Sequence, residues 1–174
     1  MVVRVYFTRR YHFSSYFIRL LSWSHFSHVE VEVDGCCYSS NGSKGVYERD
    51  TKALYHSQDM LEIWESKLDD TQKDKLIGFL KAQLGKKYDY FAALGLGLWR
   101  RDWYHNENRW FCSEIIDAAF KHAEHPLTNK YFASYRLTPN DLRTSVRLKR
   151  ISIKKNIHHK SIWKKILNFF GIAS

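Results

Sequence analysis

The chain has 174 residues, of which 44% are hydrophobic and 16% aromatic, with only two prolines. This length and composition predict one folded domain with a sizeable core and exclude a disordered chain. The net charge of +10 is uneven, because nine basic residues and no acidic residue follow Asp141. The first 141 residues are therefore nearly neutral, with 19 basic and 18 acidic side chains.

The N-terminal stretch, residues 1–13, has charges between short apolar runs. It lacks the apolar centre of a secretory signal, and no apolar run in the chain is long enough to cross a bilayer. The three cysteines include no CxxC pair and no regular Cys/His spacing, which argues against a structural zinc site. We expect a cytoplasmic protein in a reducing compartment, without a metal or other cofactor.

The first part of the chain is predicted to form an antiparallel sheet. Over residues 28–33, valines alternate with His28, Glu30 and Glu32, which is typical of a strand with one face on the core. The dipeptide Asp34-Gly35 then favours a two-residue hairpin turn. The expected strands cover residues 2–8, 28–33, 36–41, 45–49 and 60–64, and a short helix, capped by Ser14 or Ser15 and ending at Trp23, precedes the second.

The next part of the chain is predicted to be largely helical. Thr71 opens a helix that Gly85 ends. A Gly/Ala-rich segment, residues 91–99, predicts a short helix, and LTPNDL around Pro139 a turn into final strands at 146–153. The buried stripe of the first helix is Leu76, Phe79, Leu80 and Leu84. The fold class that follows is α+β, an antiparallel sheet packed against helices, with one domain at residues 1–148 and a basic extension at 149–174.

Cys112 lies in the first turn of another predicted helix, whose apolar positions are Ile115, Ile116, Ala119 and Phe120. The positive end of a helix and its unpaired N–H groups favour a thiolate. The same N–H groups, on Cys112 and Ser113, can hold a developing oxyanion. Two interpretations stay open: a nucleophile, or an apolar cysteine buried under a helix.

A thiol nucleophile needs an imidazole with an orienting partner, and His28 is the candidate. With the turn at Asp34-Gly35, Asn41 falls opposite His28 and Ser39 opposite Glu30, all on one face of the hairpin. An asparagine or a carboxylate there could fix the ring orientation. The alternative is an ordinary solvated polar face.

Four segments, SHVEVEVDG, GKKYDY, WFCSEII and LTPNDL, occur in an order and spacing that resembles a known family. It is the circularly permuted branch of the NlpC-type, papain-like cysteine hydrolases, in which the histidine strand precedes the cysteine helix. The likeness covers residues 1–145 and is strongest to the YiiX-like members, which include forms encoded by bacteriophages. For a phage-encoded protein, the expected location is the host cytoplasm or the virion.

By this resemblance, Cys112 matches the nucleophile and His28 the general base. The family often has a glutamate on the following strand, but here that position falls on Ser40 or Asn41. Asn41 is the expected third member, with Ser40 and Glu30 as alternatives, and the N–H groups of Cys112 and Ser113 are the expected oxyanion hole.

The resemblance implies hydrolysis of an amide through a thioester, in a peptide or a peptidoglycan stem peptide, although acyl-transferring relatives exist. Aromatic side chains are expected to form the rim of the substrate site. They are Trp110 and Tyr88, with Trp99, Trp103 and Tyr104.

The C-terminal extension predicts an amphipathic helix capped by Ser161, with an apolar face and lysines opposite. Such a helix either binds an anionic membrane surface, through residues 158–174, or covers the core of its own domain. No nucleic-acid motif accompanies the charge, so we expect no specific nucleic-acid binding. The alternative function is a catalytically silent domain that docks to a partner or an anionic surface through this extension.

Overall fold

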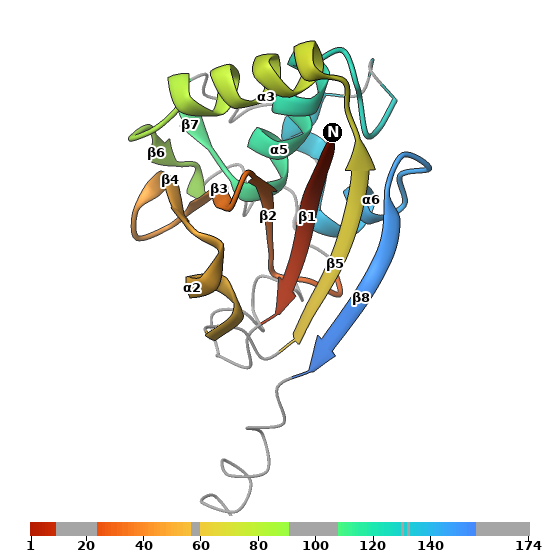
Figure 1. Ribbon diagram of the computed structural model, residues 1–174. Helices are drawn as coiled ribbons and strands as arrows, with labels where there is room; N and C mark the ends of the chain where they lie inside the picture. The colour runs from red at the N-terminus through yellow and green to blue at the C-terminus, as the bar shows by residue number, and fades with distance from the viewer. Residues whose placement is uncertain (10–23, 57–59, 91–107, 130, 132, 156–174) are drawn as a thin grey trace, which may run out of the picture.

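The computed structural model describes residues 1–9, 24–56, 60–90, 108–129, 131 and 133–155. Its centre is a six-stranded antiparallel sheet of order β4-β3-β2-β1-β5-β8 (Figure 1). These strands are β1 (Val2–Arg9), β2 (His28–Val33), β3 (Cys36–Asn41), β4 (Gly45–Asp50), β5 (Met60–Lys67) and β8 (Lys149–Lys155). The α+β class predicted from the sequence is confirmed.

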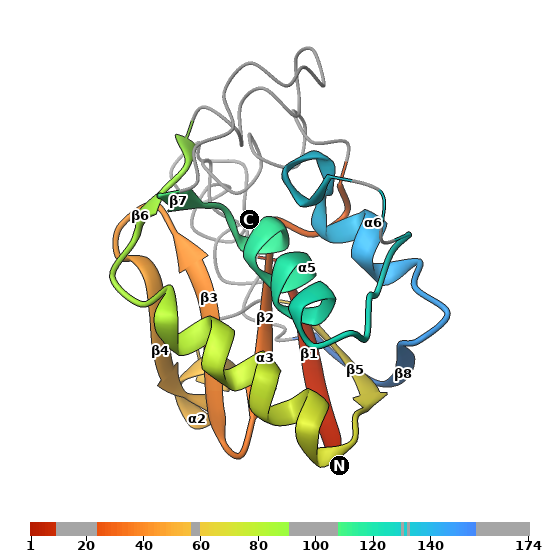
Figure 2. The ribbon, with the colours of Figure 1, turned by 90° about the horizontal axis from the view of Figure 1, so that it is seen from above.

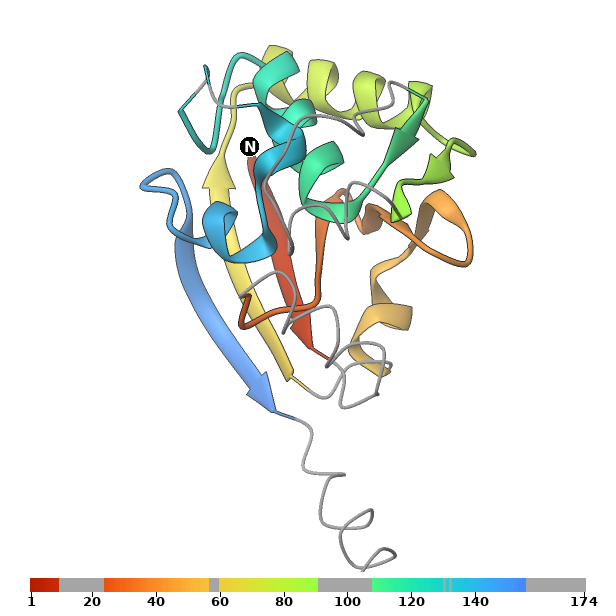
Figure 3. The same ribbon diagram turned by 180° about the vertical axis from the view of Figure 1, so that it is seen from behind.

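The helices lie mainly on one face of this sheet, where Figure 2 shows α3 and α5 side by side over the strands. Seen from behind in Figure 3, α6 lies next to α5. A short parallel pair, β6 (Lys87–Tyr88) and β7 (Arg109–Trp110), leads into α5. The helical segments are α2 (Thr51–His56), α3 (Asp70–Ala82), α5 (Cys112–His122), the 3-10 turn η2 (Ser134–Arg136) and α6 (Pro139–Arg143).

The hairpin between β2 and β3 forms at the predicted dipeptide. Asp34 and Gly35 both have positive φ, 53° and 82°, as a two-residue turn between twisted strands requires. Val33 pairs with Cys36 and Glu32 with Cys37. The turn chemistry therefore fixes the register at this end of the hairpin.

Helix α3 confirms the predicted helix with a shift at both ends. Asp69 caps it by accepting the N–H of Gln72 at 2.7 Å, and the Gln72 side chain accepts the N–H of Asp69. Leu76 and Leu80 are fully buried. Leu84 was predicted in the buried stripe, but it lies beyond the helix end and is 36% exposed.

Both faces of the sheet are covered, which the sequence did not predict. The valines of β2 face the core under α3 and α5, whereas Tyr6 and Cys37 belong to a second cluster with Leu54 of α2. On the side of this second cluster, Glu30 is 0% exposed and Glu32 is 7% exposed. The face of β2 interpreted as possibly solvated is instead an interior rich in charge.

The C-terminal part of the sheet extends beyond the predicted domain boundary at residue 148. Lys149–Lys155 pairs with β5 as β8, so this segment belongs to the main sheet. The predicted turn at LTPNDL is the short helix α6, capped by Thr138 with Pro139 in its first turn. The strand begins at Lys149 rather than at 146, and Val146 is 100% exposed.

Three predicted helices lie outside the described residues: those at 14–23, at 91–99 and in the tail from 158 to 174. Trp99, Trp103 and Tyr104 of the predicted aromatic rim also lie outside them. None of the helices in the described part is long and apolar enough to span a membrane.

Candidate active site

Helix α5 presents Cys112 at its first position, as the sequence predicts. The preceding residue, Phe111, has an extended backbone, and its carbonyl accepts the N–H of Ile115 at 3.1 Å. The N–H groups of the first turn, including those of Cys112 and Ser113, have no partner one turn earlier in a helix. The Ser113 hydroxyl donates to the Leu137 carbonyl at 2.6 Å, so this side chain anchors the helix. Ser113 can therefore offer an oxyanion only its backbone N–H.

The chain that enters α5 is attached to the sheet and to α3. Ser40 donates from Oγ to the carbonyl of Trp110 at 2.7 Å, and the Trp110 indole N–H donates to Gln83 at 3.1 Å. The Trp110 ring packs edge-on against Phe79 of α3, with centroids 5.9 Å apart. These contacts give Ser40 and Trp110 structural roles: they fix where Cys112 sits.

His28 lies at the start of β2 with its side chain 19% exposed. Its imidazole lies close enough to Cys112 for the thiol to help raise the pKa of His28. On the other side, Nε2 lies 3.3 Å from Glu30 Oε1 and 3.1 Å from the Tyr47 hydroxyl, and the Tyr47 ring is stacked at an interplanar angle of 11°. Cys112 and His28, 84 positions apart in the sequence numbering, are therefore brought together as predicted.

The electrostatics around His28 favour its protonated form. Burial alone would lower the pKa of His28, but the influence of Tyr47 and the hydrogen bonds with Cys112 and Glu30 outweigh it and raise the pKa well above the ordinary value. Burial would likewise raise the pKa of Glu30, yet His28 and Arg49 hold it below its ordinary value. The carboxylate stays ionised next to the imidazole.

The carboxylate next to His28 is that of Glu30, whereas Asn41 lies elsewhere than predicted. Regular pairing of β2 with β3 ends at Val31 and Tyr38, and Ser39 then donates from Oγ to the Val29 carbonyl at 2.6 Å. Asn41 is therefore not paired opposite His28. Its side-chain oxygen accepts the N–H groups of Ser43 and Lys44, at 3.0 and 2.9 Å, and closes the β3–β4 turn.

Two further residues complete the group, and sequence reasoning did not single them out. Tyr47 and Arg49 lie on β4, and Arg49 donates from Nε to Glu30 Oε2 at 2.9 Å and from Nη2 to Oε1. The signal for them was the alternation in GVYER, which places both side chains on one face of the third strand of the meander.

Tyr88, predicted to contact substrate, lies close to Cys112. Burial raises the pKa of Tyr88, and the charges of Cys112, Tyr90, Asp89 and Glu114 raise it further. The buried Glu114 accepts the N–H of Phe111 at 3.3 Å, and burial raises its pKa to about 8. The surroundings of Cys112 therefore include a phenol and a carboxyl group that is largely protonated at neutral pH.

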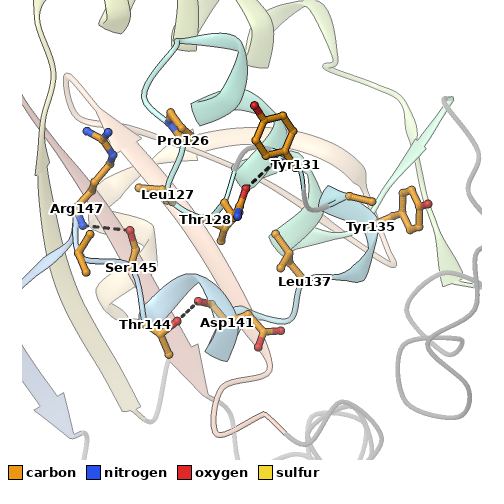
Figure 4. Close-up of a pocket in the computed structure, with 13 residues that line it drawn as sticks. Pro126, Leu127, Thr128, Tyr131, Tyr135, Leu137, Asp141, Thr144, Ser145 and Arg147 are labelled. Atoms are coloured by element: carbon orange, nitrogen blue, oxygen red, sulfur yellow. Dashed lines mark hydrogen bonds between the residues drawn. The ribbon is translucent and has the colours of Figure 1, made fainter.

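A pocket of about 930 Å³ lies elsewhere, between the loop after α5 and α6 (Figure 4). Many of its polar groups already make local turns: Asn129 accepts the N–H of Tyr131 at 3.0 Å, and Ser145 that of Arg147 at 3.2 Å. The pocket lining does not include Cys112 or His28. Within the described residues, no group of three or more His, Cys, Asp or Glu side chains is suited to a metal ion.

Comparisons with known proteins identify a fold. No protein-family model matches the chain, and no curated protein sequence does. The chain is similar to a solved structure, that of the metalloprotein YiiX from Escherichia coli O157:H7. The TM-score is 0.67 at 15% identity, and the match covers 90% of this chain and 98% of the other. The chain therefore has a YiiX-like fold.

Proposed function

We propose that this protein is a cysteine hydrolase that cleaves an amide bond through a thioester on Cys112. The observation that carries the proposal is the position of the His28 imidazole, near Cys112 and 3.3 Å from the ionised Glu30 carboxylate. A thiol at a helix N-terminus, a base in contact with it and an acid that orients the base are the parts that nucleophilic catalysis needs. The YiiX-like fold and the histidine-before-cysteine order fit the permuted NlpC-type hydrolases.

In the proposed mechanism, Cys112 and His28 form a thiolate–imidazolium pair. Because Nε2 of His28 contacts Glu30, the other ring nitrogen, Nδ1, is assigned to the sulfur. The thiolate attacks the amide carbonyl, and N–H groups of the first turn of α5 stabilise the oxyanion. As the C–N bond breaks, His28 gives its proton to the leaving amine, and water then hydrolyses the thioester with His28 as base.

The proposed substrate class is a peptide amide, including the stem peptides of peptidoglycan, and the reaction needs no cofactor. Tyr88, close to Cys112, is the proposed substrate contact. Trp110 is less suited to this role, because its ring packs on Phe79 and its N–H is bonded to Gln83. Acyl transfer uses the same thioester and differs only in which nucleophile resolves it.

The test is turnover of a panel of short peptide amides and muropeptides by the full chain and three variants. Cys112→Ala and His28→Ala should each abolish turnover while the circular dichroism spectrum stays that of the unaltered protein. Cys36→Ala is the matched control, a thiol on β3 that contacts Glu48 instead, and it should keep full activity. Turnover that survives Cys112→Ala would reject the proposal.

A second candidate function is binding to an anionic membrane surface without catalysis. It is favoured by the exposed side of β8, where Ile151 and Ile153 are 46% and 44% exposed among basic residues. Apolar side chains with flanking lysines are the composition of interfacial segments. Ile151→Asp with Ile153→Asp, and separately deletion of residues 158–174, should then weaken sedimentation with phosphatidylserine vesicles, whereas vesicles of phosphatidylcholine alone should bind no form.

A further inference from the structure

The order of the strands lets two long side chains of β4 reach across a neighbouring strand. In the register, Tyr47 pairs with Ser39 and Arg49 with Cys37 of β3, the strand between β4 and β2. Ser39 and Cys37 are small and fully buried. Because these positions on β3 are small, the Tyr47 and Arg49 side chains reach over it to contact His28 and Glu30 on β2.

Arg49 and Glu30 form a bidentate salt bridge in the interior. Glu30 is 0% exposed and Arg49 20% exposed. Arg49 Nε lies 2.9 Å from Glu30 Oε2, and Nη2 donates to Oε1, the same oxygen that faces His28 at 3.3 Å. A buried carboxylate held only by a histidine would lose its counter-charge whenever the histidine lost its proton. Arg49 cannot lose its proton, so it supplies a permanent counter-charge.

We propose that Arg49 is a positioning residue that keeps Glu30 ionised and oriented throughout the reaction. This inference rests on the proposed function of Cys112 and His28. When His28 hands its proton to the leaving amine, the bond from Arg49 retains the Glu30 carboxylate in place. Glu30 is then ready to orient His28 as base in the second half of the reaction.

Two of the groups that face this pair stay neutral near neutral pH. Burial raises the pKa of Tyr47 on β4 and raises that of Cys37 on β3 to about 12, so both stay neutral. Glu32, further along β2, is paired with Arg4 at 3.4 Å. On α5, Cys112 is the group that exchanges a proton with His28 in the proposed mechanism. The pH dependence of Cys112 reactivity therefore reports on the Glu30–Arg49 pair.

The test measures the rate of alkylation of Cys112 by iodoacetamide against pH, by mass spectrometry of the full chain. Arg49→Gln removes the permanent cation, so Glu30 should take up a proton more readily. We expect the acidic limb of the profile to move to higher pH by about one unit or more, with a plateau reduced by ~10-fold or more. Arg49→Lys retains a cation and should restore the position of the limb.

Arg4→Gln is the matched control, because Arg4 also pairs with buried and half-buried glutamates of the same sheet, Glu32 and Glu65, and is not among the contacts of His28. It should leave the profile in place. An unmoved acidic limb in Arg49→Gln, or a limb moved equally by Arg4→Gln, would overturn the inference while the proposed function stands. An inert Cys112 in the unaltered chain would overturn both.

If Arg49→Gln does not fold, a cycle with Arg49→Met, which also removes the cation, and Glu30→Gln decides the matter. Because Arg49 acts through Glu30, the double variant should alkylate Cys112 as slowly as Glu30→Gln alone. Effects that multiply in the double variant would show that Arg49 acts independently of Glu30, and the inference would be rejected.

Discussion

Asp117 and Glu30 are both fully buried and paired carboxylates, yet only Glu30 contacts a histidine that lies near Cys112. Asp117 of α5 accepts Thr128 at 2.8 Å and Ser134 at 2.7 Å, and Lys121 lies at 2.6 Å. Glu30 of β2 is held by Arg49 and His28. The difference lies in the partners: lysine and hydroxyl groups keep their protons near neutral pH, whereas His28 can exchange one with Cys112.

Asp117 has a structural role, whereas Glu30 has the contacts that the proposed catalysis requires. Asp117 joins α5 to the loop that follows it, so its contacts fix the position of the helix. Glu30 joins two strands to a titratable base. Burial and saturation with hydrogen bonds are common to both, so they do not mark a candidate site; a titratable partner near a candidate nucleophile does.

The largest effect is expected when the charge of Glu30 is removed, and the charge of Asp117 is removed for comparison. Glu30→Gln should lower kcat/KM by ~10³-fold or more, because His28 loses the anion that orients it and stabilises its protonated form. Asp117→Asn should leave kcat/KM within about 3-fold per folded molecule, since Asp117 touches neither His28 nor Cys112. Equal losses of kcat/KM in the two variants would contradict the different roles of Glu30 and Asp117.

A third buried carboxyl, that of Glu114, is expected to make the stability of the fold depend on pH. Burial raises its pKa from the ordinary 4.5 to about 8, so the folded chain keeps a proton that the unfolded chain has lost. Its contribution to stability is complete below pH 4.5 and is lost as the pH rises through about 8. We expect a loss on the order of 4 kcal/mol across this window in urea unfolding.

Glu114→Gln is the control for this effect, because an amide of similar shape cannot ionise. The free energy of unfolding of this variant should fall much less between pH 5 and pH 9. A slope identical to that of the unaltered chain would show that another group is responsible.

Asp117→Asn should have a smaller effect on stability, about 2–3 kcal/mol in the free energy of unfolding. The change weakens the charge-assisted bonds to Thr128 and Ser134 and leaves Lys121, 18% exposed, without its anion. Thr128→Val, which removes one of the two hydroxyl bonds, should cost less. A variant as stable as the unaltered protein would contradict the structural role of Asp117.

The smallest effect is expected at Ser40, the tether between β3 and the chain entering α5. Ser40→Ala removes the 2.7 Å bond to the Trp110 carbonyl and should cost about 1 kcal/mol in urea unfolding. Ser43→Ala is the exposed control, because Ser43 bonds only within the turn closed by Asn41. A loss at Ser43 equal to that at Ser40 would show that the tether is unimportant.

Much of the fold follows from local patterns in the sequence. Alternation predicted β2, the Asp34-Gly35 dipeptide predicted its turn, and apolar spacing predicted α5 with Cys112 at its start. The contact of His28 with Cys112 was also predicted. Leu84 was placed wrongly, because a periodic stripe does not reveal the residue at which the helix ends.

Spacing in the sequence did not show which of Asn41, Ser40 and Glu30 lies next to His28. A hairpin register extrapolated from its turn places Asn41 opposite His28, but β2 and β3 stop pairing after Val31. The role of Arg49 depends on the order of three strands and on small residues on the middle one. Such long-range arrangements are set by tertiary packing, which local patterns do not encode.

The most direct measurement is the alkylation rate of each cysteine against pH, in the unaltered chain and in His28→Ala. The account predicts that Cys112 reacts faster than Cys36 and Cys37 near neutral pH. In His28→Ala this advantage should be lost. A Cys112 that is inert, or that follows the profile of an ordinary thiol with and without His28, would contradict the proposed pair.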